Sequence, residues 1–185
     1  MDSAQEKHER RVGEQLIEWY NQRHGTSFRF DGRPSDVPDL KYRDGVHWLG
    51  VEVVSAYYDP DDAKFHWLAK RQRPDAPDEW EGVNFEQSLV ENINSALAAK
   101  CRKLYGANCL LAVYVFPDLT HAEEMETLIK GVRVPATHRF AGIYLCGEFP
   151  LPLDLHISRV LEGERPPPEQ RVWQLYPSLT GRNEA

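Results

Sequence analysis

The chain has 185 residues, a length that predicts one domain with a sizeable hydrophobic core. Hydrophobic residues make up 41% of it and charged residues 28%, an ordinary globular composition that excludes a mainly disordered chain. The formal net charge of −7 excludes a broad electropositive surface for DNA or an anionic membrane, because phosphate binding depends largely on Lys and Arg.

The first part of the chain predicts a helix followed by three strands. Apolar residues recur at helical spacing between Ala4 and about His24, and Gly25 follows as the expected C-cap. Three β-rich runs separated by the turn sequences "DGRPSD" and "RDG" then predict a meander of strands at Ser27–Phe30, Val37–Tyr42 and His47–Ser55.

Helices and buried strands are predicted for the rest of the chain. Asp59 and Pro60 are typical of an N-cap with proline at the first helical position, and they predict a short helix over "DDAKFHWLAKRQ". The longest one-sided apolar stripe predicts a helix from Phe85 to Tyr105, closed by Gly106. A nearly continuous apolar run at Asn108–Phe116 predicts a central strand covered on both faces. The last predicted elements are a polar helix at His121–Lys130 and strands at Phe140–Leu145 and Arg171–Tyr176.

This order of elements predicts an α/β fold in which helices flank a mixed β-sheet. We expect one domain over residues 1–165, with residues 166–185 as a proline-rich linker and C-terminal extension. The three cysteines, Cys101, Cys109 and Cys146, lack CxxC or Cys/His spacing, and we expect buried free thiols in a reducing compartment. A charged N-terminal segment and the absence of an apolar run near ~18 residues predict a soluble cytoplasmic protein without a membrane partner.

Two acids, Asp39 and Glu52, lie inside runs that otherwise look buried. If Asp44 and Gly45 form the tip of a tight hairpin, residues whose numbers sum to 89 face one another, and Asp39 lies opposite Gly50. Side chains alternate along a strand, so Glu52 shares that face as the diagonal neighbour of Asp39, roughly 7–8 Å away at the backbone. Two carboxylates this close repel unless they share a proton or a cation such as Mg²⁺, for which Gly50 leaves open space.

A second interpretation of the two acids stays open. On a half-exposed hairpin both carboxylates face solvent and pair with Lys41 or Arg43, because charged strand residues are usually solvated. A three-residue turn would also break the parity that places the two acids on one face.

The sequence around these acids resembles the signature of the PD-(D/E)XK nuclease superfamily. Pro38 and Asp39 form the "PD" pair, twelve residues separate Asp39 from Glu52, and "VEVV" at Val51–Val54 surrounds the glutamate. The preceding helix and the following helix and apolar strand are also similar to the common core of that family. The resemblance covers about Glu9 to Phe116 and implies a restriction-endonuclease-like fold.

The resemblance implies a metal site for one or two Mg²⁺ ions, or Mn²⁺, bound by Asp39, Glu52 and the backbone carbonyl of Val53. The metal would polarise a scissile phosphate and help to form hydroxide from water. A lysine normally follows the glutamate by two residues, where it orients the water and offsets phosphate charge. This chain has Val54 at that position.

A lysine from another element is the expected replacement. Lys100 is the preferred catalytic residue, because it follows Ile93 by seven residues and therefore points along the apolar stripe. The competing interpretation is a surface lysine whose stem packs at the edge of the stripe. Lys103 and Lys64 are weaker alternatives.

The first helix is expected to add another acid to the metal site. Glu9 shares the face of Val12 and Leu16, whereas Glu14 points roughly away although its local sequence "EQL" is closer to the family pattern. We prefer Glu9, and a solvated helix surface explains either residue as well.

The resemblance thus implies a Mg²⁺-dependent nuclease, with DNA as the expected substrate. The segment Lys64–Arg73 is the densest basic stretch and carries Phe65 and Trp67, so it is where we expect a local phosphate contact, although a basic surface helix explains it too. The alternative function is that of a catalytically inactive nuclease-like binding or accessory protein, favoured by Val54 and the acidic net charge. A homodimer and a monomer both stay open as assembly states.

Overall fold

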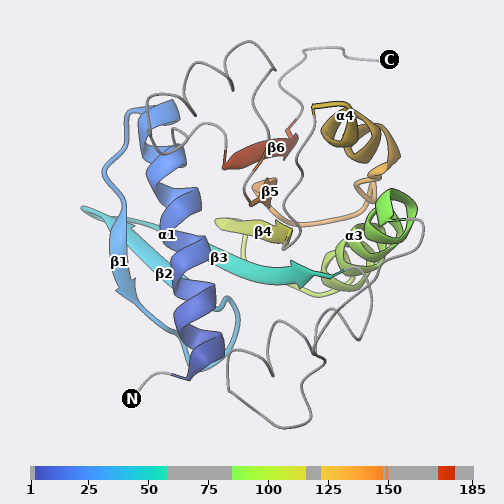
Figure 1. The fold of residues 1–185 in the computed structure, drawn as a ribbon. Helices are drawn as coiled ribbons and strands as arrows, with labels where there is room; N and C mark the ends of the chain where they lie inside the picture. The colour runs from blue at the N-terminus through green and yellow to red at the C-terminus, as the bar shows by residue number, and fades with distance from the viewer. Residues whose placement is uncertain (1–2, 58–84, 116–121, 148, 150–170, 178–185) are drawn as a thin grey trace, which may run out of the picture.

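The structure, a computed structural model, describes residues 3–57, 85–115, 122–147, 149 and 171–177. Within these residues a six-stranded open mixed sheet is covered by helices (Figure 1). The elements in chain order are α1 (Ala4–His24), β1 (Arg29–Gly32), β2 (Leu40–Asp44), β3 (His47–Ala56), α3 (Phe85–Cys101), β4 (Cys109–Val115), α4 (Ala122–Gly131), β5 (Gly142–Cys146) and β6 (Val172–Tyr176). The α/β class with a mixed sheet and flanking helices is therefore confirmed.

The six strands lie side by side in the order of the sequence, from β1 to β6. Strands β1, β2 and β3 form an antiparallel meander, β3, β4 and β5 are parallel, and β6 returns antiparallel to β5. Parallel neighbours require a crossover connection. Helix α3 lies in the connection from β3 to β4, and α4 lies in the connection from β4 to β5.

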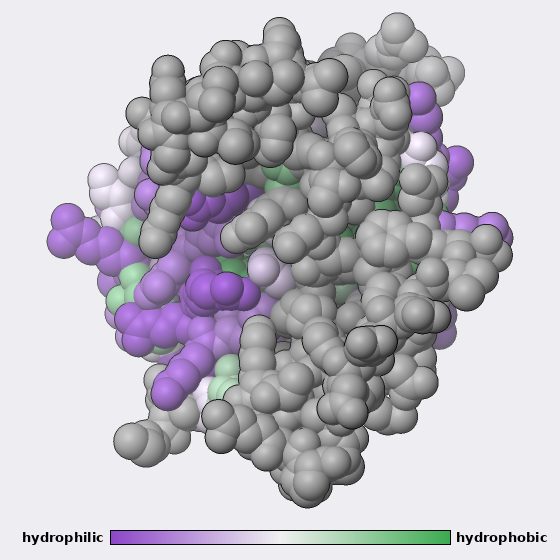
Figure 2. Space-filling view, viewed as in Figure 1, coloured by the Kyte–Doolittle hydropathy of each residue, from purple (hydrophilic) through white to green (hydrophobic). Residues whose placement is uncertain are grey.

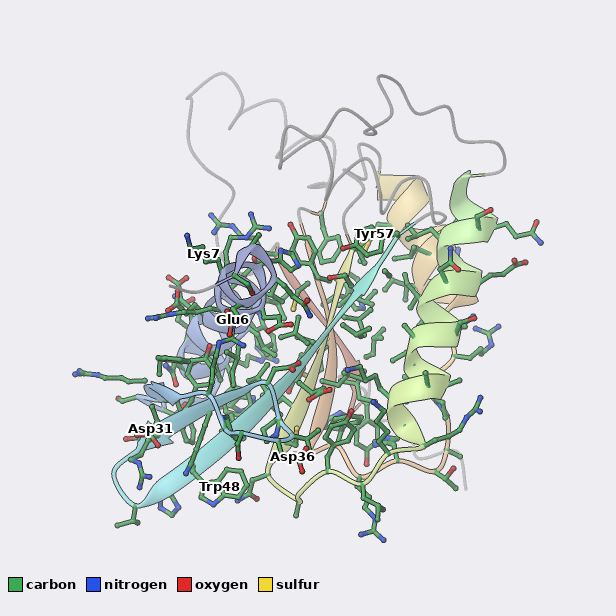
Figure 3. The ribbon with its side chains drawn as sticks, turned by 90° about the horizontal axis from the view of Figure 1, so that it is seen from below. Glu6, Lys7, Asp31, Asp36, Trp48 and Tyr57 are labelled. Carbon is green, nitrogen blue, oxygen red and sulfur yellow. The ribbon has the colours of Figure 1, made fainter. Side chains whose placement is uncertain are left out.

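Alternate residues of β4 face the two helical layers. Leu111 and Val113 pack in a core cluster with residues of α3 and α4, whereas Leu110 and Ala112 pack in a second cluster with residues of α1. Figure 3 shows the sheet with α1 on one side and α3 and α4 on the other. The prediction that this apolar run forms a central strand covered on both faces is confirmed.

Both ends of helix α1 are capped by residues that favour a helix terminus. The Ser3 side chain accepts a hydrogen bond from the Glu6 amide while the Glu6 side chain accepts one from the Ser3 amide, which forms a capping box. Gly25 ends the helix in the left-handed conformation, with φ of 64°. The outer surface of α1 is mostly hydrophilic (Figure 2), as expected for an amphipathic helix covering a sheet.

The β2–β3 hairpin differs from the predicted register by two residues. Asp44 pairs with His47, so Gly45 and Val46 form the two-residue turn and paired residue numbers sum to 91. Gly45 adopts the left-handed conformation that such a turn requires, with φ of 58°. A shift of two residues keeps every side chain on its expected face, because the side-chain period of a strand is two.

Other boundaries differ modestly from expectation. Helix α3 ends at Cys101, four residues before its predicted end, where the Lys103 amide donates to the Lys100 carbonyl in a turn. The predicted final strand forms as β6 and completes the sheet beside β5, while the expected domain boundary at residue 165 falls outside the described residues. The helix expected after Asp59 and Pro60 also falls there.

The three cysteines are buried and free, as predicted. Burial raises the pKa of the Cys109 thiol to about 12, with further contributions from Glu52 and Asp39, and burial also raises the pKa of Cys101. A nucleophilic thiolate is therefore disfavoured at these two positions. None of the helices in the described ranges combines the length and the hydropathy needed to cross a bilayer.

Candidate metal and catalytic site at the start of strand β2

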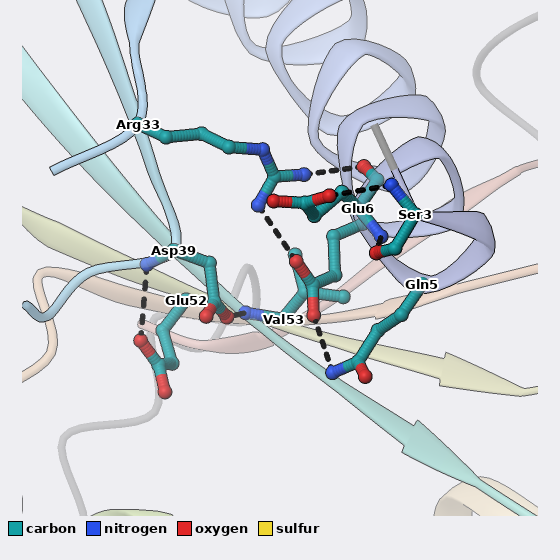
Figure 4. Close-up of polar contacts among 8 residues, drawn as sticks. Ser3, Gln5, Glu6, Arg33, Asp39, Glu52 and Val53 are labelled. Atoms are coloured by element: carbon teal, nitrogen blue, oxygen red, sulfur yellow. Dashed lines mark hydrogen bonds and ion pairs between the residues drawn. The ribbon is translucent and has the colours of Figure 1, made fainter. Parts of the chain in front are cut away.

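Asp39 and Glu52 are direct neighbours at the point where β2 begins. The last pair of the β2–β3 ladder is Leu40 with Val51, and Asp39 precedes it by one residue. The Asp39 amide donates to Oε2 of Glu52 at 3.3 Å, and the Val53 amide donates to Oδ2 of Asp39 at 2.8 Å (Figure 4). The Asp39 carboxylate thus accepts the hydrogen bond from Val53 that the backbone of β2 would accept if that strand were longer. The two acids are therefore closer neighbours than the diagonal relationship predicts.

Gly50 has a different role from the one expected of it. A Cβ added at Gly50 would lie 2.6 Å from Cγ of Pro38, so the proline ring covers this position. The expectation of open space for an ion at Gly50 is therefore wrong. Glycine is required here because it allows the Pro38–Asp39 segment to approach β3 closely.

Glu52 is a buried carboxylate, 3% exposed, with donors on both oxygens. Nζ of Lys100 lies 2.5 Å from its Oε1, and the Tyr105 hydroxyl donates to the same oxygen at 3.0 Å. Lys100 belongs to the last turn of α3 and Tyr105 follows that helix. Charged groups are rarely buried without such partners, because the loss of hydration has to be offset.

Lys100 approaches the sheet on the face where Val54 lies. Val54 alternates with Val53 along β3 and packs against the core cluster formed with α3 and α4, and Glu52 shares its face two residues earlier. The structure therefore brings an ammonium group to Glu52 from the helix, while the strand position that the family motif gives to lysine carries an apolar side chain.

Asp39 is in an environment that disfavours its charged form. Burial raises the pKa of Asp39 from 3.8 to about 6, and the negative charges of Glu52 and Glu9 add to the rise. The hydrogen bond from the Val53 amide and the positive charge of Lys100 oppose it. A cation bound beside Asp39 would relieve this excess of negative charge.

Glu9 lies near enough to act on Asp39, but its own oxygens are engaged. Nη1 of Arg33 lies 2.8 Å from Oε2 of Glu9, and the Gln5 amide donates to Oε1 at 2.9 Å. Arg33 also donates to the Glu6 carbonyl, which fixes the guanidinium at the first turns of α1 (Figure 4). The carboxylate of Glu9 is therefore committed to its partners on α1 and to Arg33.

The other acid considered on α1 lies on the surface. Oε1 of Glu14 is 2.8 Å from Nε of Arg10, and both side chains are about half exposed, at 52% and 45%. Of the two acids, it is Glu9 whose charge acts on Asp39.

The basic residues of the hairpin do not pair with the two acids. Lys41 and Arg43 both pair with Asp31 on β1, at 3.8 and 3.1 Å. The interpretation of Asp39 and Glu52 as an ordinary exposed pair with Lys41 or Arg43 is therefore wrong. Lys103 is exposed, and Lys64 together with the whole basic stretch to Arg73 lies outside the described residues.

Comparisons of this chain with protein-family models, with curated proteins and with solved structures found no match.

The donor atoms of the site are of the kind that Mg²⁺ prefers. They are oxygens from two adjacent carboxylates, and Oδ1 of Asp39 has no hydrogen-bond partner in the described part of the chain. In an extended strand the N–H and C=O of one residue point to the same side, so the Val53 carbonyl lies on the same side of β3 as the amide that donates to Asp39. Asp39, Glu52 and the Val53 carbonyl thus fit a hard divalent cation.

The described residues contain no cluster of three or more His, Cys, Asp or Glu side chains placed to share an ion. This agrees with the engagement of Glu9 by Arg33 and Gln5. The protein side chains that this site offers to a cation are therefore the two carboxylates, with the remaining positions left to backbone, water or substrate oxygens.

Tyr105 is the residue of this site that the sequence did not single out. The apolar spacing predicts it as the last residue of the α3 helix, but it lies beyond the end of that helix and its hydroxyl donates to Glu52. The available signal was a hydroxyl-bearing side chain at the end of an otherwise apolar stripe, five residues after Lys100.

Proposed function

We propose that this chain is a Mg²⁺-dependent nuclease that hydrolyses phosphodiester bonds of DNA, with Asp39 and Glu52 as metal ligands and Lys100 as the catalytic lysine. The observation that carries the proposal is the contact of three groups: Glu52 accepts from the Asp39 amide on one oxygen and from Lys100 on the other. Two acids and a lysine thus meet from three parts of the chain, namely the segment before β2, strand β3 and helix α3.

The arrangement of elements supports a restriction-endonuclease-like fold as part of this proposal. A helix, an antiparallel meander, a second helix and a parallel strand follow one another as in that family's core. The two acids lie on β3 and immediately before β2, in the positions that the family motif gives them.

Each residue has a distinct role in the proposed reaction. Asp39, Glu52 and the Val53 carbonyl would hold the cation, which would supply Lewis-acid chemistry by polarising a phosphate and acidifying a water. The Lys100 ammonium has three donors, of which Glu52 uses one. The other two have no partner among the described residues, and they would orient the attacking water or a phosphate oxygen. Lys100 is the more accessible partner, with 19% of its side chain exposed against 4% for Glu52.

DNA is proposed as the substrate with a local rather than a broad contact surface. The net charge of −7 leaves no general attraction for nucleic acid, so binding has to use a restricted set of basic residues, for which Lys64–Arg73 is the proposed segment. We place the protein in the cytoplasm.

A second candidate function is a nuclease-like accessory protein that binds a cation or DNA without cleavage. The observation that favours it is Val54, an apolar residue packed against the core where the motif has its lysine. The two functions differ in one property, which is whether a bound ion leads to hydrolysis.

The deciding experiment combines metal binding with cleavage. Wild-type protein, Asp39→Ala, Glu52→Ala and Lys100→Ala would be titrated with Mn²⁺ by calorimetry and incubated with supercoiled plasmid in Mg²⁺ or Mn²⁺. We expect the wild type to bind Mn²⁺ and nick the plasmid, the two acid variants to lose binding, and Lys100→Ala to bind Mn²⁺ but cleave about 100-fold more slowly.

Other results would favour the second candidate function or overturn the metal site. Binding of Mn²⁺ by the wild type without cleavage supports the accessory function. No Mn²⁺ binding, together with unchanged stability of Asp39→Ala and Glu52→Ala, overturns the shared metal site. Asp36→Ala serves as the control, because Asp36 is an exposed acid on the same segment (Figure 3).

A further inference from the structure

We infer that Tyr105 is a positioning residue that orients the Glu52 carboxylate, so that Oε2 is the oxygen presented to a cation. The inference rests on the proposed metal site and adds a residue that neither the motif nor the resemblance includes. It starts from one contact, the hydrogen bond from the Tyr105 hydroxyl to Oε1 of Glu52 at 3.0 Å, which is buried.

The two oxygens of Glu52 have unequal surroundings. Oε1 accepts from both Tyr105 at 3.0 Å and Lys100 at 2.5 Å. Oε2 accepts from the Asp39 amide at 3.3 Å, which is longer than an ordinary N–H···O hydrogen bond. Two good donors on Oε1 therefore leave Oε2 as the less satisfied oxygen, on the side where Asp39 lies.

Lys100 alone would not fix this orientation. An ammonium on a flexible stem acts as a point charge that both oxygens of a carboxylate can approach. A phenol hydroxyl at the end of a rigid ring has a defined position, so it selects the oxygen that faces it. With Tyr105 in place, Glu52 is held against rotation about its last torsion and Lys100 is directed to the same atom.

Packing holds the Tyr105 ring itself in place. The residue is 5% exposed and belongs to the core cluster between the sheet and the helices α3 and α4. Its ring lies against Phe140 with centroids 4.6 Å apart. The support of a ligand by a fixed hydrogen-bonding partner is the usual way in which proteins orient metal-binding side chains.

The test separates the hydroxyl of Tyr105 from its ring. Tyr105→Phe keeps the ring on Phe140 and removes only the donor to Glu52. Tyr42→Phe is the matched control, because Tyr42 is also buried, on the other face of the sheet, and its hydroxyl has no hydrogen-bond partner in the described part of the chain. Mn²⁺ affinity would be measured by calorimetry without DNA at about pH 7, with circular dichroism to verify the fold and urea unfolding to measure stability.

We expect Tyr105→Phe to bind Mn²⁺ about 10- to 100-fold more weakly than the wild type. Tyr42→Phe should match the wild type. A merely structural contribution of Tyr105 would lower the free energy of unfolding without weakening the Mn²⁺ affinity of the folded protein.

The outcomes distinguish this inference from the proposed function. Wild-type Mn²⁺ affinity in Tyr105→Phe, with Mn²⁺ binding lost in Glu52→Ala, overturns the positioning role and leaves the metal site intact. A wild-type protein that binds no Mn²⁺ overturns the metal site and the positioning role together. Equal losses in Tyr105→Phe and Tyr42→Phe also overturn the positioning role, because the effect would then belong to buried tyrosines in general.

Discussion

The ammonium of Lys100 lies 2.5 Å from Oε1 of Glu52, and the two side chains come from the strand and the helix of one βα unit. Glu52 lies in the middle of β3 and Lys100 in the last turn of α3. The pair places a positive charge against a buried carboxylate whose strand neighbours are apolar. Both the stability of the sheet and the proposed chemistry therefore depend on this contact.

Lys100→Met is expected to destabilise the protein by about 2–3 kcal/mol, because it leaves the Glu52 carboxylate buried without its cation. Methionine keeps most of the apolar stem of lysine, so the decrease in the free energy of unfolding measures the effect of removing the charge. The measurement is the free energy of unfolding in urea at pH 7.

Glu52→Gln in the Lys100→Met background should recover most of this loss, since an uncharged amide costs less to bury. Lys103→Met is the control on the same segment, and it should stay within about 0.5 kcal/mol of the wild type because Lys103 is exposed. If the loss of stability in the double variant equals the sum of the losses in the two single variants, the side chains of Lys100 and Glu52 do not interact.

Asp39→Asn is expected to flatten the dependence of stability on pH. The pKa of Asp39 is raised from 3.8 to about 6 in the folded protein, chiefly by burial. Between these values the folded state binds more protons than the unfolded state, so wild-type stability falls as pH rises from about 4 to 6 and this contribution is constant above. The difference from Asp39→Asn should reach about 1 kcal/mol once solvent screening of this half-buried group is allowed for.

Urea unfolding at pH 4, 5, 6 and 7 measures this effect. Asp36→Asn removes an exposed acid from the same segment and should keep the wild-type pH dependence. Saturating Mg²⁺ should stabilise the wild type at pH 7 and leave Asp39→Asn unchanged, because only a folded site that binds the ion gains from it. The raised pKa of Asp39 is contradicted if the free energy of unfolding of the wild type increases more between pH 4 and 6 than that of Asp39→Asn.

The hairpin shows which part of the site could be predicted from sequence. Alternation along the strands fixed the face of Asp39 and Glu52, and a two-residue shift of register kept it, because the period is two. The distance between the acids was not predictable, since it depends on the turn at Gly45 and Val46. The packing of the Pro38 ring over Gly50 was not predictable either, because it depends on the path of the segment before β2.

The α3 helix also shows which features of the site could be predicted from the sequence and which could not. Helical spacing placed Lys100 on the apolar stripe, and the structure brings it to Glu52. The same spacing predicts that Tyr105 belongs to the helix, but the helix ends at Cys101 and Tyr105 contacts Glu52 from the following segment. Periodicity predicts which face a residue shares only while the helix continues, and the end of this helix is set by a local turn.

Gly50→Ala is expected to disturb Asp39 through Pro38. The added Cβ would lie 2.6 Å from Cγ of Pro38, so the proline and the aspartate that follows it have to shift. We expect a loss of about 1–3 kcal/mol in the free energy of unfolding and a weaker Mn²⁺ affinity.

Gly106→Ala is the matched control for this substitution, since its Cβ would meet the Trp48 ring at 3.5 Å, an ordinary contact. Thermal unfolding and Mn²⁺ calorimetry on both variants check the prediction. Wild-type behaviour of Gly50→Ala would mean that the segment before β2 moves freely.

Glu9→Gln is expected to leave Mn²⁺ affinity within about threefold of the wild type, because a charge that is not a ligand acts on the site only at a distance. Both oxygens of Glu9 are engaged, one by Arg33 at 2.8 Å and one by Gln5 at 2.9 Å. The negative charge of Glu9 raises the pKa of Asp39, so its removal should extend Mn²⁺ binding to lower pH. Glu14→Gln should change neither property, because Glu14 pairs with Arg10 on the surface. A loss of affinity in Glu9→Gln as large as that in Glu52→Gln would show that Glu9 leaves Arg33 and binds the ion as a third carboxylate.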